Sequence, residues 1–393
     1  MKGNLRSDFP FFKANSGMAY LDNAATTQKP QCVIDSVVRF MTEQNSNTGR
    51  SLYPLSSDAA RLLSDARSKI ASFIDADSDE IILTGGSTEA LNIVASSLCR
   101  SRTRGNIVTT GLEHSSNFAP WMEHCRRNGI ELRVAKTDPD GSLDSRSVTD
   151  MIDKETIAVS VTGMSNVTGF MPEISAICRT ARARGAFSVI DAAQLAVHRK
   201  VDVKEIGCDF LAFSGHKLYG PQGTGVLYAA RNARTFLYPL MLGGGSVESD
   251  YRPKESPEGY EAGSRNIAGL VGLGTAIDYL KQHEDAIKQV EEDLSEYLFS
   301  SLKKLSFVKP VNVLPSPIVS FSMDGLGAYD IGTLLAQRGV YIRTGACCAY
   351  NLMRALKVEG VCRASVSFCN TGEEIDRLVE GLVWIYGRYG GRG

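Results

Sequence analysis

Between about residues 79 and 230, short runs of apolar residues alternate with stretches in which apolar residues recur at helical spacing. The predicted strands cover residues 81–84, 106–109, 156–161, 187–190, 210–213 and 225–228, and the helices between them 89–97, 117–127 and 173–184. Continuous apolar strands separated by helices are typical of a mostly parallel α/β sheet that is covered on both faces. Such a sheet binds its ligands at the carboxyl ends of the strands.

The pattern changes near three consecutive glycines at 243–245 and a polar stretch over 248–260. Beyond them we predict a long helix over 267–290, short strands at 318–321, 340–342 and 364–368, and a final helix over 373–386. We therefore expect two domains. A large domain spans 15–258, and a smaller α+β domain spans 259–393, with residues 1–14 packing back onto it.

Composition adds little to this picture, because the 393-residue chain is 43% hydrophobic, as an average globular protein is. The net charge of −1 gives no electrostatic reason to expect nucleic acid or an anionic membrane as partner. No run of about 18 apolar residues occurs, and the first residues lack a signal-peptide pattern, so we expect a cytoplasmic protein. The nine cysteines are irregularly spaced, which predicts reduced thiols and no metal site.

Two charged residues follow predicted strands. Lys217 lies just after the strand 210–213, where the edge of the sheet removes part of the water around its amine. A partly desolvated amine loses some preference for the charged form and becomes a nucleophile toward an aldehyde. Asp191 ends the strand 187–190, where its carboxylate can face a ring nitrogen. Either residue alone would be an ordinary surface or turn residue, but together they favour a shared site.

A third strand end predicts an anion site. Gly85 and Gly86 let the backbone approach an anion, the helix that follows directs its amides toward it, and Ser87 and Thr88 add hydroxyl donors. The segment fits neither the dinucleotide fingerprint nor the P-loop. A lysine that reacts with aldehydes, a carboxylate for a ring nitrogen and a phosphate site favour pyridoxal 5′-phosphate (PLP) as cofactor. His114, which follows the strand 106–109, could lie flat on the PLP ring.

Further motifs run in a fixed order along nearly the whole chain, in segments 20–27, 86–90, 113–114, 165–169, 191–194, 214–221, 243–245, 261–266 and 362–365. In this order the chain resembles a class V aminotransferase-fold PLP enzyme. Within that group it resembles a cysteine desulfurase of the SufS-like branch, close to selenocysteine lyases. The resemblance implies the type I fold of PLP-dependent transferases with a smaller C-terminal domain.

The resemblance also implies a role for each site residue. Lys217 holds PLP, Asp191 pairs with the pyridine nitrogen, Gln194 contacts the ring oxygen and His114 stacks on the ring. The implied phosphate ligands are Ser87, Thr88, Ser214 and His216, with Ser264 supplied by the second subunit of a homodimer. The implied substrate-binding residues are Asn166, Arg363 and Arg343. Arg363 would grip the carboxylate of the amino acid as a two-pronged clamp.

The sulfur chemistry depends on two adjacent thiols, Cys347 and Cys348. The branch has Arg-x-Gly-His-His-Cys-Ala here, and because Ala349 follows Cys348, the register implies Cys348 as the nucleophile. On an extended loop, adjacent side chains point in roughly opposite directions, so only one thiol should face the substrate. Its thiolate would attack the sulfur of L-cysteine and give L-alanine and a cysteine persulfide.

The chain departs from the branch around this loop. Ala346 and Cys347 replace the two family histidines, and Asn351 stands where proline is usual. Gly49 and Tyr53 stand at two further positions where the branch usually has histidines. These changes bear on proton handling and on the route to a sulfur acceptor, and they leave the PLP site intact.

The first hypothesis is a PLP-dependent cysteine desulfurase that supplies sulfur, through an acceptor protein of the Suf type, for iron–sulfur cluster assembly. The alternative is a selenocysteine lyase, or another PLP lyase, epimerase or transaminase of the same fold without persulfide chemistry. A third hypothesis, a scaffold without PLP, has no use for Lys217, Asp191 and Arg363 together. The cysteine pair ahead of Arg363 favours persulfide chemistry, while the same thiol would suit L-cysteine and L-selenocysteine.

Overall fold

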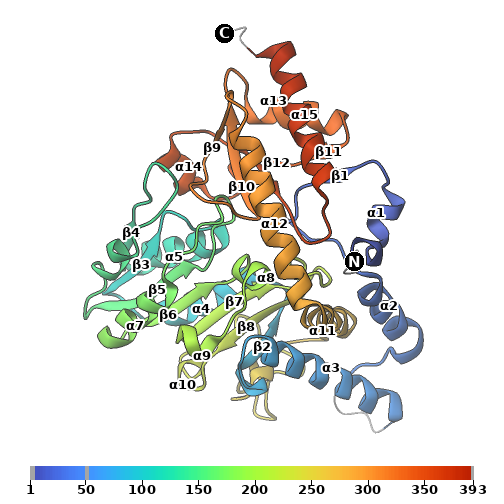
Figure 1. Cartoon of the computed structure of the whole chain (residues 1–393). Coiled ribbons are helices and arrows are strands. Elements are labelled where there is room, and N and C mark those ends of the chain that lie inside the picture. Colours follow the sequence, from blue (N-terminus) through green and yellow to red (C-terminus); the bar gives the residue numbers. More distant parts are fainter. Residues whose placement is uncertain (1–4, 49–52, 391–393) are drawn as a thin grey trace.

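The computed structural model describes residues 5–48 and 53–390, whose strands form a seven-stranded sheet, a four-stranded sheet and a two-stranded sheet (Figure 1). Within these residues the larger sheet has seven strands in the order β2-β8-β7-β6-β5-β3-β4. They are β2 (Ile81–Thr84), β3 (Asn106–Thr110), β4 (Glu131–Ala135), β5 (Thr156–Thr162), β6 (Phe187–Asp191), β7 (Phe210–Ser214) and β8 (Gly225–Ala229). Strand β8 runs in the direction opposite to the other six strands. The predicted mostly parallel sheet is confirmed.

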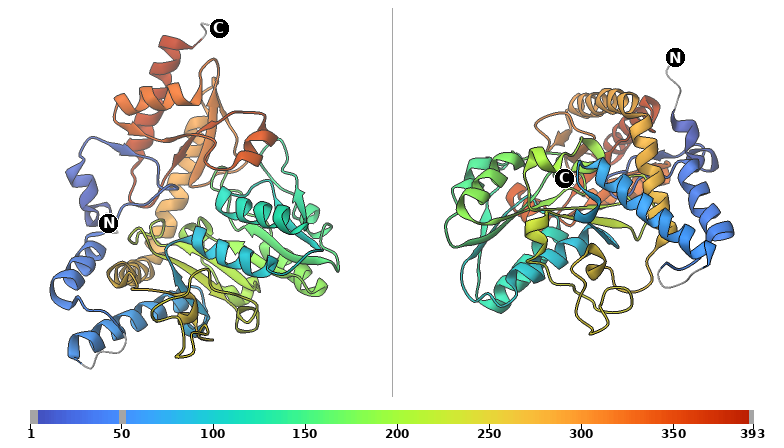
Figure 2. Two further views of the ribbon diagram at one scale, coloured as in Figure 1. Left: turned by 180° about the vertical axis from the view of Figure 1, so that it is seen from behind. Right: turned by 90° about the horizontal axis from the view of Figure 1, so that it is seen from below.

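Helices cover both faces of this sheet (Figure 2). They include α4 (Ser87–Cys99) and α5 (Ser115–Asn128) on one face, and α3 (Pro54–Phe73) and α7 (Ile174–Arg184) on the other. Along β7, Phe210 and Ala212 pack into the core on the face covered by α4 and α5. Leu211 and Phe213 pack into the core on the opposite face, because successive strand residues face opposite sides. A strand buried on both faces needs an apolar residue at nearly every position, and this produces the continuous apolar runs.

The carboxyl ends of β2, β3, β5, β6 and β7 lie at one edge of the larger sheet, since these strands run in the same direction. Asp191 is the last residue of β6, and the segments that follow the other four strands carry Ser87, His114, Asn166 and Lys217. The topology therefore gathers motifs that lie far apart in the sequence.

The second sheet is antiparallel, with the order β12-β13-β10-β9. Its strands are β9 (Val308–Pro310), β10 (Ile318–Met323), β12 (Arg343–Gly345) and β13 (Val361–Ser365), and helices α13 (Ala328–Gln337) and α15 (Gly372–Tyr389) share its core. The pairing of β12 with β13 places Arg343 opposite Arg363. The two cysteines follow β12 and line the same cavity as residues of the larger sheet.

The region between the two sheets differs from the prediction. The helix expected over 267–290 is two helices, α11 (Ile267–Gln282) and α12 (Glu284–Lys303), because His283 leaves the helical conformation (φ −115°, ψ 14°). Helix α11 packs against α3 and α2 (Gln31–Arg39), in the part that holds the larger sheet. Helix α12 contributes to the core of the small sheet. This packing favours a join between the domains near His283 rather than at residue 258.

The N-terminal segment also contacts the smaller part. Arg6 forms an ion pair with Glu374 of α15 (3.1 Å). Strand β1 (Ala19–Tyr20) pairs in parallel with β11 (Val340–Tyr341), and Asp22 forms a bridge to β13. The contact with the small sheet thus extends past residue 14, where the sequence placed the start of the large domain.

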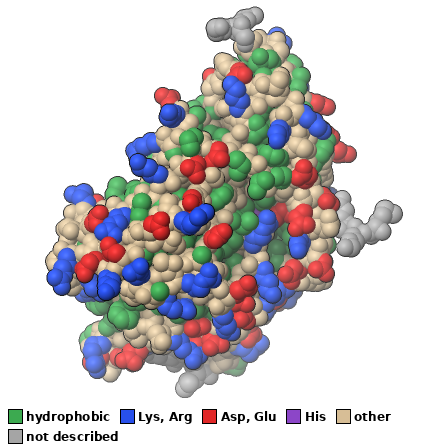
Figure 3. Space-filling model, turned by 60° about the vertical axis from the view of Figure 1, so that its left-hand side comes forward, with side chains coloured by type: hydrophobic (Ala, Val, Ile, Leu, Met, Phe, Trp, Pro, Cys, Tyr) green, Lys and Arg blue, Asp and Glu red, His purple; other side chains and the backbone are tan. Residues whose placement is uncertain are grey.

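Figure 3 shows acidic and basic side chains interspersed over one face of the molecule, so neither sign dominates there. This distribution is in keeping with the net charge of −1. Across the described part of the chain, no helix combines the length and the apolar character needed to cross a membrane.

Candidate active site

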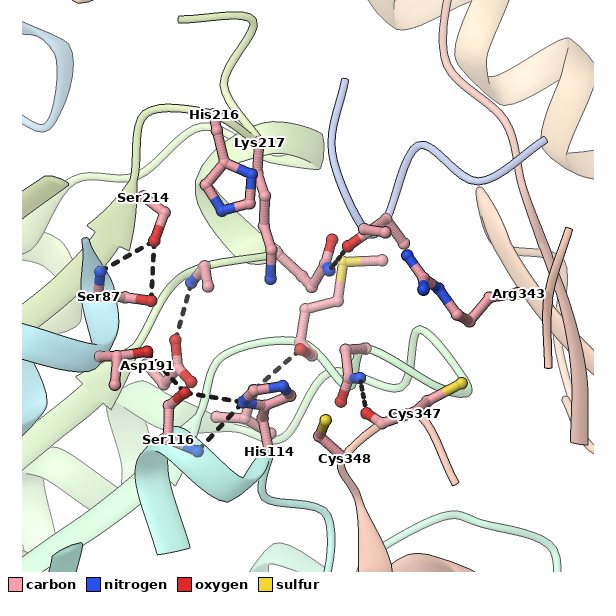
Figure 4. Close-up of a pocket in the computed structure, with 18 of the residues that line it drawn as sticks. Ser87, His114, Ser116, Asp191, Ser214, His216, Lys217, Arg343, Cys347 and Cys348 are labelled. Carbon is pink, nitrogen blue, oxygen red and sulfur yellow. Dashed lines mark hydrogen bonds between the residues drawn. The ribbon is translucent and has the colours of Figure 1, made fainter. Parts of the chain in front are cut away.

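A cavity of about 330 Å³ lies between the carboxyl edge of the larger sheet and the small sheet (Figure 4). The predicted site residues that line it are Ser87, Thr88, His114, Asn166, Asp191, Gln194, Ser214, His216, Lys217, Arg343, Cys348 and Arg363. Cys347 lines it too. Ser264 does not, and its side chain is exposed on the loop before α11. The structure therefore brings the predicted residues together except for the one expected from a second subunit.

Lys217 and Asp191 face each other at the buried end of this cavity. Burial lowers the pKa of the Lys217 amine, while the charge of Asp191 acts in the opposite direction. Burial raises the pKa of Asp191. The charge of Lys217 and the amide of Ala193, which donates to Oδ1 of Asp191 at 3.0 Å, both oppose this rise. A lysine with a lowered pKa has more of the neutral amine, which is the form that attacks an aldehyde.

The N-terminus of α4 forms an anion cradle with the end of β7 and the start of α5. The amide of Ser87 donates to Oγ of Ser214 (2.9 Å), whose hydroxyl donates to Oγ of Ser87 (2.9 Å). Gly225 of β8 passes so close that a Cβ there would lie 2.3 Å from the Cα of Gly86. Thr88 shares a hydrogen bond with the hydroxyl of Ser116 (2.8 Å). Helix amides and hydroxyls from separate elements suit a phosphate.

Two histidines flank Lys217, and both are neutral at pH 7. Burial lowers the pKa of His114 to about 4, with further lowering by Lys217 and Arg363. The amide of Ser116 donates to Nδ1 of His114 (3.1 Å), so the proton of the neutral ring lies on Nε2. Burial and Lys217 lower the pKa of His216 to about 4 as well. Both rings can therefore lie against a cofactor without adding charge.

Two arginines of the small sheet meet at one carboxylate, that of Asp22. Arg363 donates from Nη2 to Oδ1 of Asp22 (3.1 Å), and Arg343 pairs with Oδ2 (2.9 Å). Arg363 also donates from Nη1 to the carbonyl of Asn166 (2.9 Å). No role was predicted for Asp22. It lies within the motif 20–27, which carries part of the family resemblance and could have indicated a role. Asp22 holds both guanidinium groups at the cavity.

Cys347 and Cys348 form a tight turn rather than the extended loop predicted. Both have left-handed backbone conformations, with φ of 48° and 56°. Figure 4 shows the Cys348 sulfur pointing toward the cavity near His114, whereas the Cys347 sulfur points to the other side. Burial raises the pKa of Cys347, and Arg363 and Arg343 oppose this. The two thiols point in different directions as expected, but the cause is the left-handed turn and not an extended backbone.

Of the positions where the family has histidines, Cys347 lines the cavity, whereas Ala346 and Tyr53 are not among its lining residues. Ala346 packs against the main core, and Tyr53 is exposed just before α3. Gly49 lies outside the described residues.

These residues fit PLP. Three buried polar atoms of cavity residues have no partner within the described chain: Nδ1 of His216, Oδ1 of Asn166 and Nε of Arg363. The buried amine of Lys217, the carboxyl of Asp191 and the cradle at α4 match the aldehyde, ring nitrogen and phosphate of PLP in kind. Unpaired buried polar groups are costly, so a ligand that satisfies them is expected.

The family model described as Aminotransferase class-V matches residues 19–378. The chain belongs to this family, whose enzymes use PLP. Within it, the chain belongs with the cysteine desulfurases. The resemblance to a PLP enzyme of the cysteine desulfurase type is thereby confirmed, and so is the type I fold.

Two curated relatives and two solved structures illustrate the similarity. A cysteine desulfurase of Pectobacterium atrosepticum is 38% identical over 400 residues, covering 97% of each chain. A probable cysteine desulfurase of Methanothermobacter thermautotrophicus is 38% identical over 400 residues, covering 98% of each. The cysteine desulfurase CsdA of Escherichia coli superposes with a TM-score of 0.90 at 30% identity, over 98% of each chain. That of Thermococcus onnurineus gives 0.91 at 33%, over 98% of each.

Proposed function

We propose that this chain converts L-cysteine and the thiol of Cys348 into L-alanine and a persulfide on Cys348. One observation supports this most directly: Cys348 is an exposed residue of the small part, yet its sulfur points into the cavity that holds buried Lys217. The reaction balances because the substrate sulfur moves to Cys348 and the carbon it leaves takes up a proton.

Lys217 would hold PLP in the resting enzyme, and Asp191, Gln194 and His114 would contact its ring. Ser87, Thr88, Ser214 and His216 would hold its phosphate. When bound, PLP supplies an electron sink for the negative charge that develops at the substrate α-carbon. The free amine of Lys217 then removes the α-proton, since its lowered pKa favours the neutral base.

Arg363 and Arg343 orient the substrate and the thiol. The unpaired Nε of Arg363 and its remaining Nη protons can donate to the substrate carboxylate while Asp22 holds the guanidinium in place. Arg343, half-exposed at the mouth of the cavity, lines the same cavity as Cys348 and pairs there with Oδ2 of Asp22. His114 can donate a hydrogen bond from Nε2, because its Nδ1 already accepts from the amide of Ser116.

We further propose a homodimer in which the partner subunit's Ser264 completes the phosphate site. Exposed apolar side chains precede the Ser264 loop, namely Phe236, Tyr238, Leu240, Met241, Leu242 and Tyr251. A second copy would cover them. The sulfur on exposed Cys348 would pass to an acceptor protein of the Suf type for iron–sulfur cluster assembly. Free, mostly buried thiols elsewhere in the chain suit the cytoplasm.

Product analysis tests the proposal. The enzyme is incubated with L-cysteine or L-selenocysteine, with and without a thiol reductant, and alanine and released chalcogen are measured. With L-cysteine and reductant, we expect alanine and sulfide in equal amounts; without reductant, alanine formation stalls once Cys348 is loaded. Cys348→Ser should make no alanine from L-cysteine. Alanine formation by Cys348→Ser at the wild-type rate would refute the proposal.

A further inference from the structure

The loop that carries Cys347 and Cys348 is tied to the larger part of the molecule by hydrogen bonds that the proposed chemistry does not use. We infer that Ser115 and Asn166 are positioning residues that hold Cys348 in the conformation that faces the cavity. This inference rests on the proposed role of Cys348 as the nucleophile.

Ser115 provides two donors to one atom of the nucleophilic residue. It is the first residue of α5 and follows His114 directly. Its amide donates to the carbonyl oxygen of Cys348 at 2.7 Å, and its hydroxyl donates to the same oxygen at 2.8 Å. The first amides of a helix have no partner within the helix, and the positive end of the helix dipole favours an oxygen acceptor there. The Cys348 carbonyl therefore caps α5.

Asn166 ties the neighbouring carbonyl. Its Nδ2 donates to the carbonyl of Cys347 at 2.8 Å, and its own carbonyl accepts from Nη1 of Arg363 at 2.9 Å. The amide oxygen Oδ1 is buried without a partner in the described chain, and as an acceptor it cannot bind a carboxylate. In this arrangement the grip on the substrate carboxylate falls to Arg363, and Asn166 connects that arginine to the cysteine loop.

The conformation of the loop explains why such restraint is needed. Cys347 and Cys348 occupy the left-handed region, which non-glycine residues rarely adopt. One bond within the turn, from the amide of Ala349 to the carbonyl of Ala346 (2.9 Å), closes it. The carbonyls of Cys347 and Cys348 accept hydrogen bonds from Asn166 and Ser115 of the larger part. The position of the nucleophile is thus fixed by how the two parts of the molecule meet.

Proline at position 115 offers a sharp test. Ser115→Pro removes both donors, and proline is tolerated at the first position of a helix. His114 already has the extended conformation (φ −64°, ψ 150°) that a residue before proline favours. Ser115→Ala removes only the hydroxyl, and Ser115→Thr keeps both donors as the matched control. Asn166→Ala releases the second anchor and keeps the test available if Ser115→Pro does not fold.

Each PLP-loaded variant is compared with wild type in three measurements. We expect kcat for alanine formation from L-cysteine to fall about tenfold or more in Ser115→Pro and less in Ser115→Ala, because small misplacements of a reacting group can cost up to about a hundredfold. Hydrogen exchange in the peptide 343–352 should accelerate in Ser115→Pro and Asn166→Ala. The absorption spectrum of bound PLP and the apparent L-cysteine affinity of Ser115→Pro should stay at wild-type values, and Ser115→Thr should match wild type throughout.

Wild-type kcat together with wild-type exchange of 343–352 in Ser115→Pro would overturn the inference. If that variant does not fold, the same result in Asn166→Ala would overturn it. A wild-type enzyme that makes alanine without placing sulfur on Cys348 would instead overturn the proposed function. The two failures are therefore distinguishable.

Discussion

Burial around Lys217 acts in opposite directions on the acids and bases of the site. It lowers the pKa of Lys217 and His114, since removal of water disfavours their charged forms, and it raises the pKa of Asp191. Lys217 and Asp191 then partly restore each other's charge. The result is a set of groups that exchange protons readily, which PLP chemistry at an α-carbon requires.

His114 predicts how the stability of the cofactor-free protein depends on pH. Its pKa is about 4 in the folded protein, below the ordinary value of 6.5. The unfolded chain therefore binds the proton more tightly, so the contribution of neutral His114 is complete above pH 6.5 and is lost as the pH falls toward 4. From pH 7 to 5, wild type should lose about 1–2 kcal/mol more unfolding free energy than His114→Gln. Urea unfolding measures this, and equal losses would contradict it.

Arg363→Lys tests the grip on the substrate. The ammonium of a lysine lacks the planar, fixed donor geometry of a guanidinium. It cannot donate to Asp22, to the Asn166 carbonyl and to a substrate carboxylate at the same time. We expect KM for L-cysteine to rise about tenfold or more, the equivalent of losing about 1.5–3 kcal/mol of a charge-assisted hydrogen bond, with the PLP spectrum nearly unchanged. Steady-state kinetics and absorption spectra check both. Loss of PLP with unchanged KM would place Arg363 in the cofactor site instead.

At the scale of secondary structure, the sequence predicted those elements whose burial is uniform. Strands β5 and β7 are buried at every position, so their apolar runs were visible directly. Strand β4 was missed because it lies at the edge of the sheet and begins with an exposed Glu131. Helices α2 and α3 were missed too, and the end of α11 at His283 has no glycine or proline to mark it.

The sequence predicted the site residues that lie next to a strand, and it did not predict contacts between distant segments of the chain. Lys217 and Asp191 each follow a strand, so their approach to one edge follows from the topology. The bridge that Asp22 forms between Arg343 and Arg363 joins residues more than 300 positions apart, and no periodicity reports it. The left-handed turn at Cys347 and Cys348 depends in the same way on anchors in a different part of the chain.

Glu261 connects several elements beneath the Ser264 loop. Its carboxylate accepts from Nη1 and Nη2 of Arg67 in α3 (2.8 and 2.9 Å), from Nε of Arg265 (2.7 Å) and from the amide of Leu83 in β2 (2.9 Å). Glu261→Gln removes the buried carboxylate that pairs with Arg67 at 2.8 Å and leaves the more exposed Glu258 at 3.7 Å, so we expect a loss of about 3 kcal/mol in unfolding free energy.

The matched control is Glu258→Gln, whose carboxylate lies 3.7 Å from the same arginine with a side chain that is 38% exposed. That change should cost less than about 1 kcal/mol. Denaturant unfolding of the two variants compares them, and equal losses would show that the buried network does not stabilise the fold.

At the scale of the whole molecule, the reaction needs both parts at once. The larger sheet supplies Lys217, Asp191 and the phosphate cradle, while the small sheet supplies Arg343, Arg363 and Cys348. The cavity lies where they meet, so the relative position of the two parts decides whether the thiol reaches the substrate.

The proposed homodimer predicts that retention of PLP depends on assembly of the two subunits. Sedimentation should show a dimer, and dilution toward monomer should release PLP, because the phosphate site loses the partner subunit's Ser264. Ser264→Ala should keep the dimer while it binds PLP more weakly, which dialysis followed by absorption spectroscopy can detect. A stable monomer with full activity and full PLP content would contradict the shared site.

The central claim is that Cys348 receives the substrate sulfur. Wild type, Cys348→Ser and Cys347→Ser are each treated with L-cysteine without reductant, and the peptide over 343–352 is analysed by mass spectrometry. The account predicts one added sulfur on Cys348 in wild type and in Cys347→Ser, and none in Cys348→Ser. Added sulfur on Cys347 in wild type, with Cys347→Ser inactive and Cys348→Ser active, would contradict it.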